Sequence, residues 1–102
     1  MARKEQKAQA IEDLREGRTA SLRCHGNSMN PRIPSGSRIT LEPCTADECE
    51  VDDAVLCRVK GTIYVHKVKA KQGGRVQISN LKGRVNGWTK AVYGRVVAVE
   101  NP

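Results

Sequence analysis

The chain has 102 residues, which suit a single domain, and its only aromatic residues are two Tyr and one Trp, so its core must be aliphatic. No apolar run approaches the ~20 residues of a membrane-spanning helix, and the charged N-terminal segment lacks a signal-peptide core, which predicts a soluble, cytoplasmic protein. An excess of 18 Lys and Arg over 11 Asp and Glu gives a net charge of +7, which favours a polyanion such as nucleic acid among the candidate partners.

The N-terminal segment is expected to form a helix over residues 3–16. It is rich in strong helix formers, contains no Pro or Gly, and places Ala10, Ile11 and Leu14 on one face. Gly17 then supplies a left-handed stop at the C-terminal end. Because the apolar stripe is narrow, this helix should pack against a larger body.

Beyond Gly17 the hydrophobic period changes to the alternation that is typical of half-buried β-strands. Turn-forming sequences such as Lys60-Gly61 separate the apolar runs. The expected strands are residues 21–24, 38–42, 54–59, 62–69, 75–79 and 94–99. The predicted fold class is a small, mostly antiparallel β-domain over residues 18–102 with one N-terminal α-helix over residues 1–17, a single domain overall.

The four cysteines lie at spacings that fit no structural zinc site. Cys24, Cys44, Cys49 and Cys57 include no Cys-x2-Cys pair, which such a site needs. A reducing compartment argues against disulfide bonds. We therefore expect free thiols, no bound metal and no cofactor.

The segment over residues 23–36 differs most from ordinary loop sequence. Ser28 follows Gly26 closely, at a place where the backbone can turn sharply and expose a hydroxyl. Met29 can pack inward and anchor this turn, and Pro31 can make the chain that leaves it rigid. A hydroxyl beside free backbone N–H groups could act as a nucleophile with an oxyanion site. A well-ordered turn in which Ser28 bonds to the backbone would explain the same residues.

The Ser28-Met29-x-Pro31 box, with glycines on either side, resembles the nucleophile box of the LexA-like and signal-peptidase-like serine peptidases. Residues 51–56 resemble the Gly-Asp-x-Val strand of that family, and residues 63–68 resemble the strand that carries its general base. The resemblance covers nearly all of the chain beyond the helix. It implies a LexA/signal-peptidase-like β-fold.

The resemblance places His66 at the position of the general base. LexA-type repressors and bacterial signal peptidases carry Lys there, whereas microsomal and archaeal signal peptidases carry His in a similar Val-His-Arg-Val setting. Ser28 would be the nucleophile and His66 the general base and then acid, with Gly26, Met29 and Pro31 completing the nucleophile and oxyanion box. A partly buried strand histidine with one hydrogen bond is the alternative interpretation of His66.

The resemblance also implies an orienting Asp near the end of the chain, from a Gly-Asp-Asn element. The corresponding stretch, residues 81–88, has Arg84 and no carboxylate. A cation there would oppose the imidazolium that forms when Ser28 loses its proton. We therefore expect hydrolysis that is weak or absent and that depends on Ser28, and binding that survives the loss of Ser28.

A polar, basic segment over residues 80–88 carries the only Trp and is a candidate binding surface. Its candidate contact residues are Asn80, Lys82, Arg84, Asn86 and Trp88. An exposed Trp88 could stack on a base or on an apolar partner. We favour the alternative that Trp88 fills a core poor in aromatic residues.

The sequence supports two functions. The first is a soluble serine-peptidase-type domain that acts on a peptide or protein through a Ser28–His66 dyad. The alternative is a catalytically silent β-domain of phage or mobile-element type that binds nucleic acid or a host protein through its basic surface. Neither function needs a membrane or a cofactor.

Overall fold

The computed structural model describes residues 4–102 and begins with a single helix, α1 (Lys4–Arg15). Ala10, Ile11 and Leu14 are 3% to 6% exposed and form its buried face, as the spacing predicts. The helix therefore follows the expected range closely, although residue 3 lies outside the described residues.

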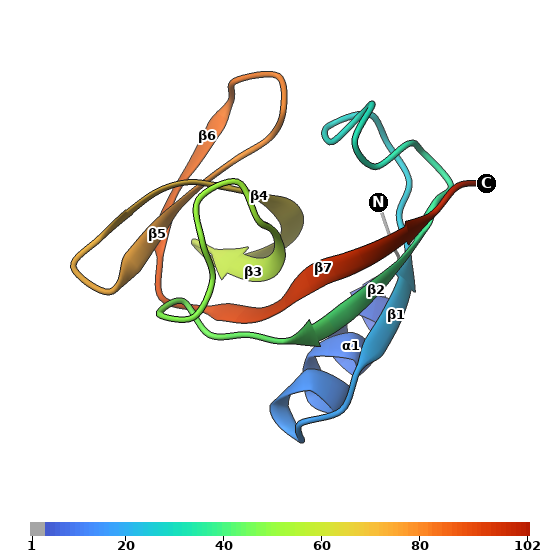
Figure 1. The fold of residues 1–102 in the computed structure, drawn as a ribbon, viewed down its shortest axis with the longest axis horizontal. Coiled ribbons are helices and arrows are strands. Elements are labelled where there is room, and N and C mark those ends of the chain that lie inside the picture. Colours follow the sequence, from blue (N-terminus) through green and yellow to red (C-terminus); the bar gives the residue numbers. More distant parts are fainter. Residues whose placement is uncertain (1–3) are drawn as a thin grey trace.

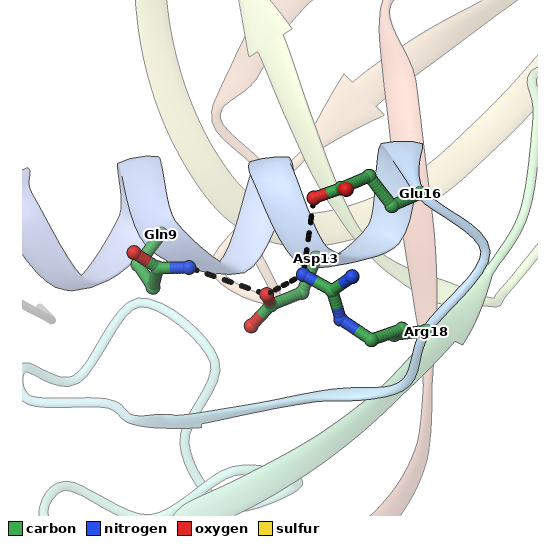
Figure 2. Close-up of polar contacts among 4 residues, drawn as sticks. All are labelled: Gln9, Asp13, Glu16 and Arg18. Atoms are coloured by element: carbon green, nitrogen blue, oxygen red, sulfur yellow. Dashed lines mark hydrogen bonds and ion pairs between the residues drawn. The ribbon is translucent and has the colours of Figure 1, made fainter.

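Arg18 fixes the C-terminal end of α1. Gly17 turns the chain with a φ of +82°, and the Arg18 N–H then donates to the backbone oxygen of Asp13 at 2.9 Å. The Arg18 guanidinium contacts the carboxylates of Asp13 at 2.7 Å and Glu16 at 3.0 Å, and Gln9 donates to the same Asp13 carboxylate (Figure 2). The bond from Arg18 holds the pKa of Asp13 below its ordinary value.

Seven strands follow the helix and form one antiparallel sheet. They are β1 (Ala20–Arg23), β2 (Arg38–Pro43), β3 (Ala54–Val59), β4 (Thr62–Gln72), β5 (Arg75–Ser79), β6 (Val85–Thr89) and β7 (Val92–Glu100). Their order across the sheet is β1-β2-β7-β3-β4-β5-β6, so β1 and β6 are the edge strands. The sheet curls, with α1 against its β1–β2 end and β5 and β6 at the other end (Figure 1).

The expected fold class, mostly β with one N-terminal helix, is confirmed. All six expected strands are present, with small differences at their ends. The seventh strand, β6, was not expected, because the Asn86-Gly87 pair is typical of a turn. Here the pair lies inside a strand that hydrogen-bonds to β5.

The expectation that Trp88 fills the core is wrong, because its side chain is 40% exposed. Trp88 lies opposite Gln77 in the β5–β6 pair. The neighbours of Gln77 on β5, Val76 and Ile78, are fully buried, so the alternation along the strand turns Gln77 and Trp88 away from the core. The core is aliphatic.

The core consists of two clusters of buried side chains. One lies between α1, β1, β2, the loop that follows β1 and part of β3. The other lies among β3, β4, β5, β7 and the segment between β2 and β3, and it includes three of the four cysteines. Within residues 4–102, no helix is both long enough and apolar enough to span a membrane.

Candidate active site

The loop between β1 and β2 presents Ser28. Its two ends are tied together, since the Cys24 N–H donates to the Ser37 oxygen at 2.8 Å and the Gly36 N–H donates to the Cys24 oxygen at 2.6 Å. Met29, the neighbour of Ser28, is 4% exposed and packs in the core cluster beneath α1. The loop is therefore closed at its base and anchored beside Ser28.

His66 lies in the middle of β4 and is 6% exposed. Its Nε2 atom lies 3.2 Å from Oγ of Ser28, so the expected proximity of these two side chains is confirmed. Tyr64 stacks on the imidazole with 4.8 Å between the ring centroids. This stacking, together with burial, restricts the orientation of the imidazole ring.

Asn86 contacts the other ring nitrogen, with 2.7 Å between Oδ1 and Nδ1 of the imidazole. In the β5–β6 pair, Gly87 lies opposite Ile78 and Val85 lies opposite Ser79, which leaves Asn86 as an extra residue without a partner on β5. Such a β-bulge redirects a side chain, and Gly87 adopts a φ of +138° that favours glycine. The bulge accounts for the direction of the Asn86 side chain.

The contact with Asn86 determines which nitrogen of the neutral imidazole carries the proton. A side-chain amide oxygen can only accept hydrogen bonds, so Nδ1 of His66 is the donor and Nε2 faces Ser28 with its lone pair. Burial lowers the pKa of His66, the bond to Asn86 opposes this, and the positive charge of Lys7 lowers the pKa further. The imidazole is therefore neutral at pH 7 and able to accept a proton.

A small cavity of about 20 Å³ opens beside Ser28 and His66, and Lys7 and Cys24 also line it. Lys7 is 7% exposed, its Nζ donates to the Ile63 oxygen at 3.2 Å, and burial lowers its pKa. Burial raises the pKa of Cys24, so this second potential nucleophile stays protonated. Lys7 was not among the expected site residues, because a single cation on an amphipathic helix carries no functional signal in the sequence.

The expected nucleophile box differs in its details. The Gly26 N–H donates to Oγ of Ser35 at 3.0 Å, so it is already engaged. Met29 acts through packing, and Pro31 is exposed. The N–H of Ser28 forms no hydrogen bond within residues 4–102, so it can serve a developing oxyanion.

Of the five contact residues expected in residues 80–88, Asn86 is the one that reaches His66. Asn80 orders the turn between β5 and β6, where its Oδ1 accepts hydrogen bonds from the backbone N–H groups of Lys82 and Arg84. The expectation that Arg84 stands beside the imidazole is wrong, since Arg84 is exposed and it is Asn86 that contacts His66. Lys82 is exposed as well.

The four cysteines are free. Burial raises the pKa of Cys44 to about 11 and that of Cys57 to about 12, so neither is a thiolate at neutral pH. In the part of the chain that the structure describes, no group of three or more His, Cys, Asp or Glu side chains is placed to hold a metal ion.

The comparison with protein families agrees with this geometry. The family model described as Peptidase S24-like matches residues 3–86. The chain belongs to the Peptidase S24-like family. The Peptidase S24-like match includes Ser28, His66 and Asn86, and it confirms the resemblance drawn from the nucleophile box and the His66 strand. No curated protein matched the chain.

Proposed function

We propose that this Peptidase S24-like chain hydrolyses peptide bonds of a peptide or protein substrate through Ser28, His66 and Asn86. The observation that carries the proposal is the continuous path from Ser28 Oγ to His66 Nε2 at 3.2 Å and from His66 Nδ1 to Asn86 Oδ1 at 2.7 Å. A nucleophile, a base and a group that orients the base recur in acyl-transfer enzymes of unrelated folds, and Asn takes the third place in some of them.

In the first step, Oγ of Ser28 attacks the carbonyl carbon of the scissile bond while its proton moves to Nε2 of His66. The carbonyl oxygen gains negative charge, which the Ser28 N–H stabilises. The imidazolium then donates the same proton to the leaving amine, and the C–N bond breaks. An ester between Ser28 and the acyl part of the substrate remains.

In the second step, His66 removes a proton from a water molecule, and the resulting oxygen attacks the ester carbon. The bond to Oγ breaks, Oγ regains a proton from His66, and the carboxylic acid product leaves. The buried, neutral state of His66 suits both steps, because the imidazole must begin each of them without a proton.

The activity is expected to be weak but measurable. Asn86 orients the ring but carries no negative charge, so it stabilises the imidazolium less than a carboxylate does. Replacing the triad Asp by Asn in a chymotrypsin-type enzyme costs about 10⁴-fold because the wrong tautomer forms. Here Nδ1 donates to the Asn86 oxygen, so the productive tautomer is retained and the penalty is smaller.

The test is hydrolysis of an unfolded protein substrate and of a mixed peptide library, followed by mass spectrometry. Wild type and Ser21→Ala, which removes an exposed serine of β1, should cut the same bonds at the same rate. Ser28→Ala and His66→Gln should lose at least about 10²-fold in rate. Cleavage that persists in Ser28→Ala would overturn the proposal, and so would the absence of cleavage by the wild type.

A further inference from the structure

The positive charge of the chain is concentrated in one part of the sequence. Residues 54–99 contain ten Lys and Arg and no Asp or Glu, whereas ten of the eleven acidic residues precede residue 54. The basic part comprises β3 to β7. Its β5 and β6 strands lie at the end of the molecule away from α1 (Figure 1). A polyanion would therefore meet this end of the sheet favourably.

A shallow groove of about 380 Å³ lies in this basic part, lined by Gln72, Gly73, Arg75 and Trp88. This volume is within the usual range for ligand-binding clefts. The groove combines an exposed indole with an exposed guanidinium. It shares no lining residue with the cavity beside Ser28.

Further cations lie at both ends of the strand that carries Trp88. Arg84 comes immediately before β6 and Lys90 immediately after it, and both are exposed. A carboxylate lies beside the β4–β5 turn next to the groove, where Oδ1 of Asp47 would be 3.7 Å from a Cβ added at Gly74. A bound polyanion is therefore expected to run along β6 rather than towards the turn at Gly74.

We propose that this groove binds single-stranded nucleic acid, with a base stacked on Trp88 and the phosphates placed against Arg75 and the cations that flank β6. Stacking on exposed aromatic side chains within a basic groove is the general mode by which proteins hold single strands without reading their sequence. Arg75 can also stack on a base while its charge attracts a phosphate.

The chemistry of the groove favours a single strand over other polyanions. The base faces of a duplex are hidden in its stack, so a duplex could use the cations but not the indole. An acidic peptide would likewise be attracted by charge alone, since its carboxylates have no favourable contact with the face of an indole. The exposed Trp88 thus distinguishes the three kinds of ligand.

The first measurement is the quenching of tryptophan fluorescence by a short oligothymidylate. Because Trp88 is the only Trp of the chain, its emission reports this groove alone. We expect saturable quenching and an affinity that falls as the salt concentration rises. A duplex of the same length and polyglutamate, added at the same concentration of charge, should quench weakly or not at all.

The second measurement compares variants by the fluorescence anisotropy of a dye-labelled oligothymidylate. Trp88→Ala should weaken binding at least about fivefold, the lower end of what one stacked base contributes. Arg75→Gln should reduce the slope of log affinity against log salt concentration by about one, which corresponds to one lost phosphate contact. The matched control is Arg15→Gln, which removes an exposed charge on α1 and should leave the affinity nearly unchanged.

The proposal is overturned if oligothymidylate does not quench Trp88, if the duplex or polyglutamate quenches it equally, or if Trp88→Ala binds as tightly as the wild type. It is independent of the proposed hydrolysis, because Ser28→Ala leaves the groove intact. Ser28→Ala should therefore bind oligothymidylate with the affinity of the wild type. A loss of binding in Ser28→Ala would place the nucleic acid at the Ser28 cavity instead and would contradict the assignment of the groove as the binding site.

Discussion

Asn86 and His66, which are 20 positions apart in the sequence, are joined by a 2.7 Å contact between Oδ1 and Nδ1. The contact depends on the bulge of β6, which leaves Asn86 without a partner on β5 and turns it towards the imidazole. The amide orients the ring as the carboxylate of a Ser-His-Asp triad does, but it contributes no charge to the imidazolium. The properties of the site should therefore respond strongly to substitutions at Asn86.

Asn86→Asp should raise kcat/KM by roughly five- to tenfold, because a charged acceptor stabilises the imidazolium more than a neutral one by about 1 kcal/mol. Asn86→Ala should lower kcat/KM by about 10²- to 10⁴-fold, since Nδ1 loses the partner that fixes the tautomer. Both values come from initial rates with one peptide substrate. If Asn86→Ala keeps the wild-type rate, Asn86 does not position His66.

The rate of hydrolysis should depend on pH through His66. Burial holds the pKa of His66 below its ordinary value of about 6.5. Only the neutral imidazole accepts the Ser28 proton, so kcat/KM should rise as the pH increases through this lowered pKa and should be constant near pH 7 to 8. A profile of kcat/KM against pH measures this directly. An acid limb centred above about pH 6.5 would show that the imidazolium is favoured in the folded protein.

Lys7→Met should move the acid limb of this profile to higher pH. The charge of Lys7 lowers the pKa of His66, and Met removes that charge while it retains an apolar stem in the buried position. Arg15→Met, which removes an exposed charge from the same helix, should leave the profile unchanged. Coincident acid limbs for wild type and Lys7→Met would mean that Lys7 does not act on His66.

Gly94→Ala should destabilise the contact between α1 and β7. An added Cβ would lie 2.7 Å from the backbone oxygen of Glu42 and 2.9 Å from Cδ1 of Leu14, so the backbone or the helix must shift. We expect the free energy of unfolding in urea to fall by about 1–3 kcal/mol. Val97→Ala, at an exposed position of β7, serves as the control and should change it by less than about 0.5 kcal/mol. Equal stability of both variants would contradict this close packing.

The local features of the fold could be predicted from the sequence, because they depend on short-range patterns. The helical face of Ala10, Ile11 and Leu14 and the alternating strands follow from periodicity. The pairing of Ser28 with His66 followed from a family resemblance, since nothing in the two segments alone indicates that they meet. Their contact spans 38 positions and depends on the whole sheet.

The role of Asn86 could not be predicted, because Asn-Gly is the usual sequence of a tight turn as well as one that suits a bulge. Only the pairing of β6 with β5 distinguishes the two. The burial of Trp88 was predicted wrongly for the same reason, because residues 85–89 were not recognised as a strand. Once β6 is a strand whose Gly87 faces the core, its neighbour must face outward.

The most direct test of the site is covalent labelling of the folded protein by a fluorophosphonate, read by mass spectrometry of the digested chain. The reagent phosphonylates a serine hydroxyl that a neighbouring base has activated: Oγ bonds to phosphorus and fluoride leaves. The Ser28–His66–Asn86 path predicts a single adduct on Ser28, which disappears in His66→Gln and forms faster in Asn86→Asp. An adduct that forms equally in His66→Gln, or no adduct on Ser28 in the wild type, would contradict the assignment of Ser28 as an activated nucleophile.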